Sequence, residues 1–139
     1  MQSVAIKGLD RVTRMLEKLP DSIKQARTEA LETEGVKLLG IVRAGIGGTG
    51  RVAGVQEVYM GSGRGYVAVR AKAKTRLDGY AAGYVTNSLE NGHRMAGGHG
   101  RVSGKYMYAN TQPEAVAAAG RVLAVVEREV KKHLEGNQA

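Results

Sequence analysis

Residues 111–136, TQPEAVAAAGRVLAVVEREVKKHLEG, carry the clearest structural signal in the chain. Thr111-Gln112-Pro113-Glu114 has the spacing of a capping box, and proline suits an early helical position. Gly136 follows a last turn rich in cations, where positive charge is favoured and glycine ends a helix. The apolar residues that recur three or four positions apart are Val116, Ala119, Leu123, Val126, Val130 and Leu134. This period predicts a C-terminal helix over residues 111–135.

The N-terminal end is predicted to be helical over residues 9–44. Leucine and valine at helical spacing predict a short helix over residues 9–19, which Pro20 ends. A second helix, capped by Asp21 or Ser22, is expected to run to about Ala44. Its apolar positions are Ile23, Ala26, Ala30, Leu31, Leu38, Leu39 and Val42. Its expected solvent-facing positions are Lys24, Arg27, Glu29, Glu32, Glu34 and Lys37.

Between these helices the hydrophobic period changes to that of strands. Residues 55–60 and 66–74 are predicted strands, joined by a glycine-rich hairpin turn. In the second strand, alternation places Val67, Val69, Ala71 and Ala73 toward the core and Arg70, Lys72 and Lys74 on the opposite face. Residues 80–89 fit a short strand or a short helix, and residues 92–105 a glycine-rich basic loop. The order of elements predicts an α+β fold, with two N-terminal helices and one C-terminal helix packed on a small antiparallel sheet.

The composition limits the class of protein. A chain of 139 residues fits one domain over residues 1–139, with a basic, glycine-rich segment of strands and loops at 45–105. The absence of cysteine excludes disulfides, thiolate metal sites and a cysteine nucleophile. No apolar run approaches the roughly 20 residues that span a bilayer, so we expect a soluble protein. Without phenylalanine or tryptophan the core is thin, which indicates either an oligomer that shares buried surface or a helical core of alanine, leucine and valine that suffices alone.

The net charge of +8 is concentrated in the middle of the chain. Residues 43–105 carry ten basic side chains against three acidic ones, whereas both ends are nearly balanced. Such asymmetry bears on partners rather than on the fold. The candidates for a channel- or DNA-facing surface are Arg64, Arg70, Lys72, Lys74 and Arg76. Their face would follow phosphates without reading sequence, or it would be solvated or meet an acidic neighbouring subunit.

The remaining motifs give little support for catalysis, a cofactor or a metal. Residues 45–50 have the glycine spacing of a dinucleotide-binding loop, but they follow a helix and precede a strand, the reverse of what that loop needs. Residues 61–65 fit a hairpin turn better than an anion-binding nest. His93 and His99 have no nearby carboxylate or cysteine to complete a metal site. We therefore expect no catalytic, cofactor-binding or metal-binding residues and no enzyme.

Five short segments, at residues 8–10, 16–20, 48–52, 84–92 and 102–108, follow one another in an order that resembles a known family. This family is the tail-completion proteins of long-tailed bacteriophages, which include minor tail components and head–tail joining proteins. Gly8-Leu9-Asp10 and Leu16-Glu17-Lys18-Leu19-Pro20 resemble the start of that family. Residues 48–52 are similar to its Arg-Thr-Gly-x-Leu segment, without the arginine before Thr49. Residues 84–92 match its tyrosine-containing segment ending in Glu-x-Gly, and residues 102–108 its Val-Pro-Gly-basic-aromatic stretch, with Ser103 in place of proline.

The resemblance implies a structural virion protein with a tail-tube-like α+β fold. Such proteins form rings, usually hexamers, in the neck or at the top of the tail, between the head connector and the tail tube or terminator. The ring's channel passes the phage DNA, and the resemblance implies neither catalysis nor a membrane partner. The candidates for partner contacts are Arg94, Arg101, Lys105, Tyr106 and Tyr108. The alternative is a small basic protein that binds DNA without sequence preference and would show salt-dependent binding of duplex.

Overall fold

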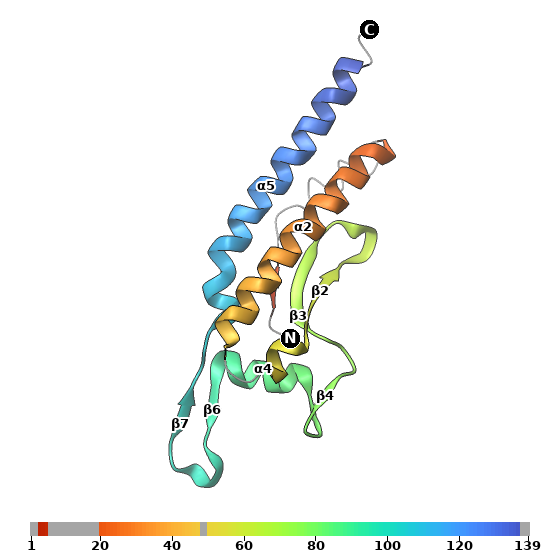
Figure 1. Cartoon of the computed structure of the whole chain (residues 1–139). Helices are drawn as coiled ribbons and strands as arrows, with labels where there is room; N and C mark the ends of the chain where they lie inside the picture. Colours follow the sequence, from red (N-terminus) through yellow and green to blue (C-terminus); the bar gives the residue numbers. More distant parts are fainter. Residues whose placement is uncertain (1–2, 6–19, 48–49, 137–139) are drawn as a thin grey trace.

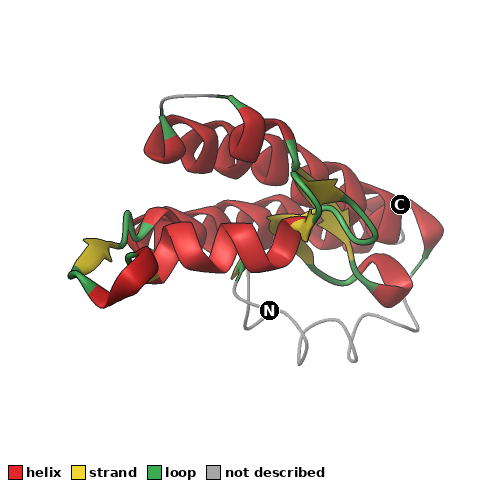
Figure 2. Ribbon diagram, turned by 90° about the horizontal axis from the view of Figure 1, so that it is seen from below, coloured by secondary structure: helices red, strands yellow, loops and turns green. Residues whose placement is uncertain are grey.

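The computed structural model describes residues 3–5, 20–47 and 50–136, and it has the expected α+β architecture (Figure 1). Two long helices dominate it, α2 (Asp21–Ile46) and α5 (Met107–Gly136). Helix forms most of the described body, and the strands are short (Figure 2). The helix predicted over residues 9–19 lies outside the described residues.

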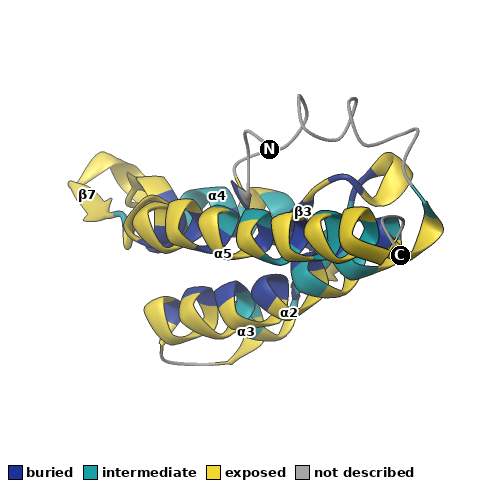
Figure 3. Ribbon diagram, turned by 90° about the horizontal axis from the view of Figure 1, so that it is seen from above, coloured by how far each residue is buried: buried dark blue, intermediate teal, exposed yellow. Residues whose placement is uncertain are grey.

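Helices α2 and α5 run antiparallel and pack along each other, forming the main core. A row of buried residues on α2 lies on the side next to α5 (Figure 3), and buried Gly35 faces the sheet. The core cluster draws on both helices through Leu31, Leu38, Val42, Ile46, Met107, Ala115, Ala118 and Val122. A smaller cluster joins Ile23 to Val126 toward the other end of the pair.

A three-stranded antiparallel sheet packs against this helix pair. Its order is β1 (Val4–Ala5), β3 (Val67–Ala71) and β2 (Gln56–Met60). Val69 lies opposite Val58 on one side and Val4 on the other. The predicted β2–β3 hairpin is therefore confirmed, with the short 3-10 turn η1 (Ser62–Arg64) between the strands. The two-residue strand β1 was not expected from the sequence.

Gly35 lets α2 lie directly on the sheet. A Cβ at this position would stand 2.7 Å from Val67 Cγ2 and 2.8 Å from Val58 Cγ1. Atoms at such distances overlap, so any side chain here would push the helix away from the strands. Gly35 thus sets the spacing between α2 and the β2–β3 hairpin.

The remaining elements lie near the C-terminal end of α2 (Figure 1). They are α3 (Arg51–Gly54), β4 (Arg76–Leu77), β5 (Tyr80–Ala81), α4 (Ala82–Asn91), β6 (Gly92–Arg94), η2 (Ala96–Gly98) and β7 (Arg101–Ser103). Strands β4 and β5 form one small hairpin, and β6 and β7 form another. Both hairpins project away from the long helices, toward the same end of the molecule. The segment 80–89, which fitted either a strand or a helix, begins as β5 and continues as α4.

Helix α5 begins four residues earlier than its predicted cap. Thr111 is buried inside the helix, where its hydroxyl donates a hydrogen bond to the carbonyl of Met107 at 2.6 Å. Pro113 also lies inside the helix rather than at its start. The apolar stripe predicted from Val116 to Leu123 was wrong, because the buried positions lie one residue earlier. Val116 is 65% exposed, and Ala115, Ala118 and Val122 are buried in its place.

Two further expectations about faces were wrong. Arg27 and Glu34 were assigned to the solvated side of α2, but each is only 6% exposed. Strand β3 ends at Ala71, so Lys72 and Lys74 do not continue an alternating strand face. Lys74 instead sits in a turn with a φ of 58°. The segment predicted as a basic loop, residues 92–105, contains the β6–β7 hairpin, because its backbone groups pair across the turn.

Candidate interaction surfaces

A buried carboxylate fixes the base of the β6–β7 hairpin. Glu90, near the end of α4, is 3% exposed and accepts hydrogen bonds from the backbone N–H groups of Tyr108 (2.9 Å) and Ala109 (3.1 Å). These donors belong to the first turn of α5, where backbone N–H groups lack partners within the helix and carry partial positive charge. Glu90 therefore caps α5 from outside the helix. The whole β6–β7 hairpin lies between the capping residue and the capped helix in the sequence.

Backbone contacts reinforce this closure. Lys105 N–H donates to Leu89 O at 2.8 Å, and Tyr106 N–H donates to Glu90 O at 3.1 Å. Gly104 approaches the end of α4 so closely that a Cβ would stand 2.2 Å from the carbonyl oxygen of Glu90. The two ends of the hairpin are thus held together by main-chain contacts that leave no room for another residue type at Gly104.

A buried polar network links the start of α5 to β2 and α4. The Tyr108 hydroxyl donates to the side-chain oxygen of Gln56, and the Gln56 amide donates to Thr86 Oγ1 at 3.1 Å. All three residues are at most 3% exposed. Burial, with a smaller contribution from the negative charge of Glu90, raises the pKa of Tyr108 far above the ordinary tyrosine range. The network joins β2, α4 and α5, and its polar groups gave no periodic signal in the sequence.

Two of the five candidate partner-contact residues have internal roles. Tyr108 is buried in this network and is not on a contact surface, so that expectation was wrong. The Lys105 ammonium donates to the carbonyl of Ile46 at 2.8 Å, near the C-terminus of α2, where a cation is favoured. Tyr106 is 51% exposed, and Arg94 and Arg101 are exposed on the hairpin itself.

The β6–β7 hairpin offers two different faces, and residues 93–103 are all exposed (Figure 3). Arg94 and Arg101 lie directly opposite each other on one face. Like charges in such a cross-strand pair repel each other. Strand alternation places His93 and Val102 on the other face. Val102 is 42% exposed, and Met95, which directly follows β6, is 49% exposed. The hairpin is therefore an exposed arm that is fixed at its base, with Arg94 and Arg101 on one face and His93 and Val102 on the other.

The predicted basic strand face does not exist as one surface. Arg64 lies in the turn at one end of β3, and Lys72 follows its other end, so the strand separates them. Arg70 is partly neutralised, since its Nε lies 3.3 Å from Glu57 Oε1 and its guanidinium stacks 3.5 Å from the centre of the Tyr59 ring. Lys72, Lys74 and Arg76 are brought together, around an open pocket of about 510 Å³ beside the start of α4.

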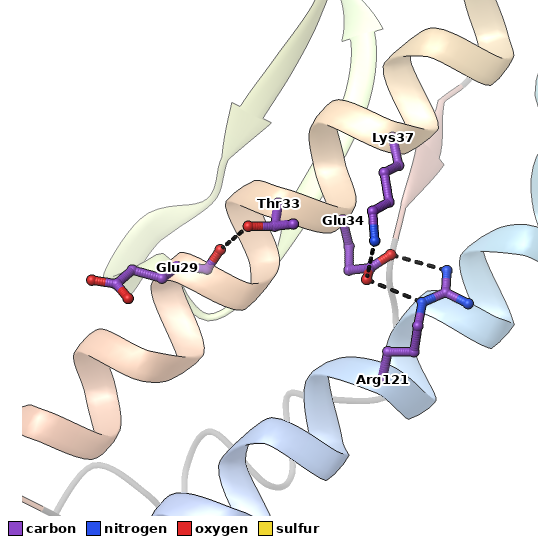
Figure 4. A network of polar contacts seen from close by, with 5 residues as sticks. All are labelled: Glu29, Thr33, Glu34, Lys37 and Arg121. Atoms are coloured by element: carbon purple, nitrogen blue, oxygen red, sulfur yellow. Dashed lines mark hydrogen bonds and ion pairs between the residues drawn. The ribbon is translucent and has the colours of Figure 1, made fainter.

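A third surface lies along the two long helices. Figure 4 shows the Arg121 guanidinium of α5 donating from Nε (3.0 Å) and Nη2 (2.9 Å) to the two oxygens of Glu34 on α2. Lys37 adds a contact of 3.2 Å to the same carboxylate. The hydrogen bonds from Arg121 hold the pKa of Glu34 below its usual range, although burial acts in the opposite direction. An open groove of about 490 Å³ runs beside this pair, and its lining mixes alanine and valine with glutamate and arginine.

The described residues contain no group of three metal-ligating side chains. Within the same part of the chain, no helix is long and apolar enough to cross a membrane. His93 and His99 lie on the exposed arm, as solvated histidines. The chain matches no protein-family model, no curated protein and no solved structure.

Proposed function

We propose that this chain is a structural subunit of a long-tailed bacteriophage, which assembles into a ring at the neck or at the top of the tail. The observation that carries the proposal is the β6–β7 arm. It is exposed over residues 93–103, yet its base is fixed by Glu90, Lys105 and close main-chain packing. An arm that is rigid at its base and uncovered along its length fits a subunit that inserts it against another chain.

The chemistry of the arm supports such a contact. Met95 and Val102 both expose apolar surface on the arm, and covering that surface is favourable in proportion to the area removed from water. Arg94 and Arg101 are a like-charged cross-strand pair, which an anionic group of a partner would stabilise, although Arg101 Nη2 also donates to the carbonyl of Asn91 at 3.1 Å. A neighbouring copy or a connector protein with an apolar pocket edged by carboxylates would satisfy both faces.

The order of segments along the chain supports the phage assignment. The segments that resemble the tail-completion family include residues 84–92 and 102–108, which flank the arm and form its base. In this proposal the partners are other copies of the chain, usually six in a ring, together with the connector and the tail tube. Phage DNA would pass through the channel of the ring, and the protein would be part of the finished virion.

A variant with a charged arm tests this function. Met95→Asp and Val102→Asp, introduced together into a phage that encodes the chain, change exposed positions and leave the core intact. We expect the isolated protein to melt normally and the infected cells to yield unjoined heads and tails. The matched variant Met95→Leu with Val102→Ile keeps the apolar surface and is expected to restore whole particles. Normal infectious yield from the aspartate variant would overturn the proposal.

A further inference from the structure

We infer that the pocket beside the start of α4 binds phosphate groups of a nucleic-acid backbone. Three of its eight lining residues are basic, Lys72, Lys74 and Arg76, and none is acidic. The other lining residues are small and leave the space of about 510 Å³ open; they are Ala73, Thr75, Ala81, Ala82 and Gly83. A concave surface that is lined by one sign of charge concentrates counterions of the other sign.

The nearest carboxylate in the sequence is held away from this pocket. Asp78 is the only acidic residue between positions 72 and 83, and it lies in the β4–β5 turn. Its carboxylate pairs with Arg51 and lines a different pocket, together with Leu77 and Tyr80. Strand alternation explains the separation, because the opposed pair Arg76 and Ala81 faces the basic pocket and the pair Leu77 and Tyr80 faces the other. The positive charge in the basic pocket is therefore not neutralised from within the hairpin.

Two other basic side chains in this part of the chain have acidic partners. Arg70 has its own partner in Glu57, and Arg51 has Asp78. No described carboxylate lies within ion-pair distance of Lys72, Lys74 or Arg76 among the contacts of residues 20–47 and 50–136. Phosphate oxygens suit such a site, since lysine and arginine both donate several hydrogen bonds to them. A backbone contact of this kind carries no sequence preference.

This inference rests on the proposed function in one respect: the proposed ring identifies the nucleic acid as phage DNA. The isolated full-length chain serves for the test, so that binding is measured without assembly. The pocket variant carries Lys72→Gln, Lys74→Gln and Arg76→Gln at exposed positions. The matched control carries Lys24→Gln, Lys131→Gln and Lys132→Gln on the long helices and has the same net charge. The probe is a short fluorescent DNA duplex, titrated at several salt concentrations.

We expect the wild-type chain and the control to bind the duplex with a steep salt dependence. In the pocket variant, the slope of log affinity against log salt is expected to fall by about two to three, since each lost phosphate contact removes about 0.9. Pyrophosphate is expected to compete with the duplex, and polyglutamate of equal charge to compete much less. An equal loss in the control variant would overturn the inference, because the binding would then reflect net charge alone.

Two other outcomes would also overturn it. Polyglutamate that competes as well as pyrophosphate would assign the pocket to an acidic protein segment. Loss of pyrophosphate binding without a change in the duplex slope would assign it to free phosphate rather than to nucleic acid. None of these results touches the proposed ring, which the arm variants test through particle assembly and which makes no use of the pocket residues.

Discussion

The carboxylate of Glu90 on α4 accepts the backbone N–H of Tyr108 on α5 at a distance of 2.9 Å. The two residues stand on either side of the β6–β7 arm, so this one contact both caps α5 and closes the arm. Replacing Glu90 by glutamine removes the negative charge and leaves one oxygen for two donors. We expect Glu90→Gln to lower the free energy of unfolding by about 1–3 kcal/mol.

Urea denaturation measures this loss, and Glu114→Gln on the exposed side of α5 is the matched control. The control is expected to change stability by less than about 0.5 kcal/mol. Hydrogen exchange in residues 101–106 should also become faster in Glu90→Gln, because the base of the arm opens more often. Equal effects of the two substitutions would contradict the capping role.

Gly35 and Gly40 lie on the same helix and are expected to respond to alanine in opposite ways. At Gly35, the new Cβ would overlap Val67 and Val58, so we expect a loss of about 1–3 kcal/mol despite the better helix propensity. At Gly40 the added methyl meets nothing within 4 Å, and we expect a gain of about 0.5–1 kcal/mol. Thermal or urea unfolding of both variants measures the difference, and stabilisation by Gly35→Ala would contradict the packing of α2 on the sheet.

Tyr108 is expected to stay protonated at a pH where exposed tyrosines ionise, since burial raises its pKa. A spectrophotometric titration of the folded chain through about pH 10–11 should therefore show less phenolate than six tyrosines would give. Because an unfolded tyrosine ionises near pH 10, this group stabilises the fold below that pH and its contribution is lost as the pH rises further. Tyr108→Phe should therefore give the same amount of phenolate as the wild type over this range. A variant that gives one phenolate fewer than the wild type would contradict the buried network.

Glu34 makes the stability of the fold depend on pH in the opposite direction to Tyr108, with a loss of stability at low pH. Its pKa is lowered by the hydrogen bonds from Arg121, so the pair stabilises the fold above the ordinary glutamate pKa of about 4.3. That contribution is lost as the pH falls through the lower folded value. We expect Glu34→Gln to be less stable than the wild type at neutral pH, and the difference to shrink below about pH 4. Urea midpoints across this range measure it, and a constant difference would contradict the ion pair.

The long helices were predictable because their apolar residues repeat at helical spacing. The start of α5 was not, because its cap comes from Glu90, eighteen residues before Tyr108, rather than from a local capping box. Thr111 bonds within the helix instead. Since the helix starts earlier, the residue that reaches the core is Ala115 and not Val116. Long-range caps of this kind leave no fixed spacing in a sequence.

The candidate surfaces were predicted in part. Lys72, Lys74 and Arg76 were singled out for their charge and do share a pocket, but a turn groups them and not a strand face. Arg70 shares their charge and yet pairs with Glu57 across the strands. The arm was predicted only as a loop, because glycines obscure the pairing of Arg94 with Arg101. The contacts that close its base, from Lys105 and Tyr106 to Leu89 and Glu90, join residues that are far apart in the sequence.

The central claim is that the β6–β7 arm is covered by another protein chain in a ring at the phage neck. Electron cryomicroscopy of whole particles of a phage that encodes the chain tests this most directly. We expect ring density at the junction of head and tail that fits α2 and α5, with Met95 and Val102 buried against a neighbouring chain. Whole infectious particles without this chain, or with the arm exposed to solvent, would contradict the claim.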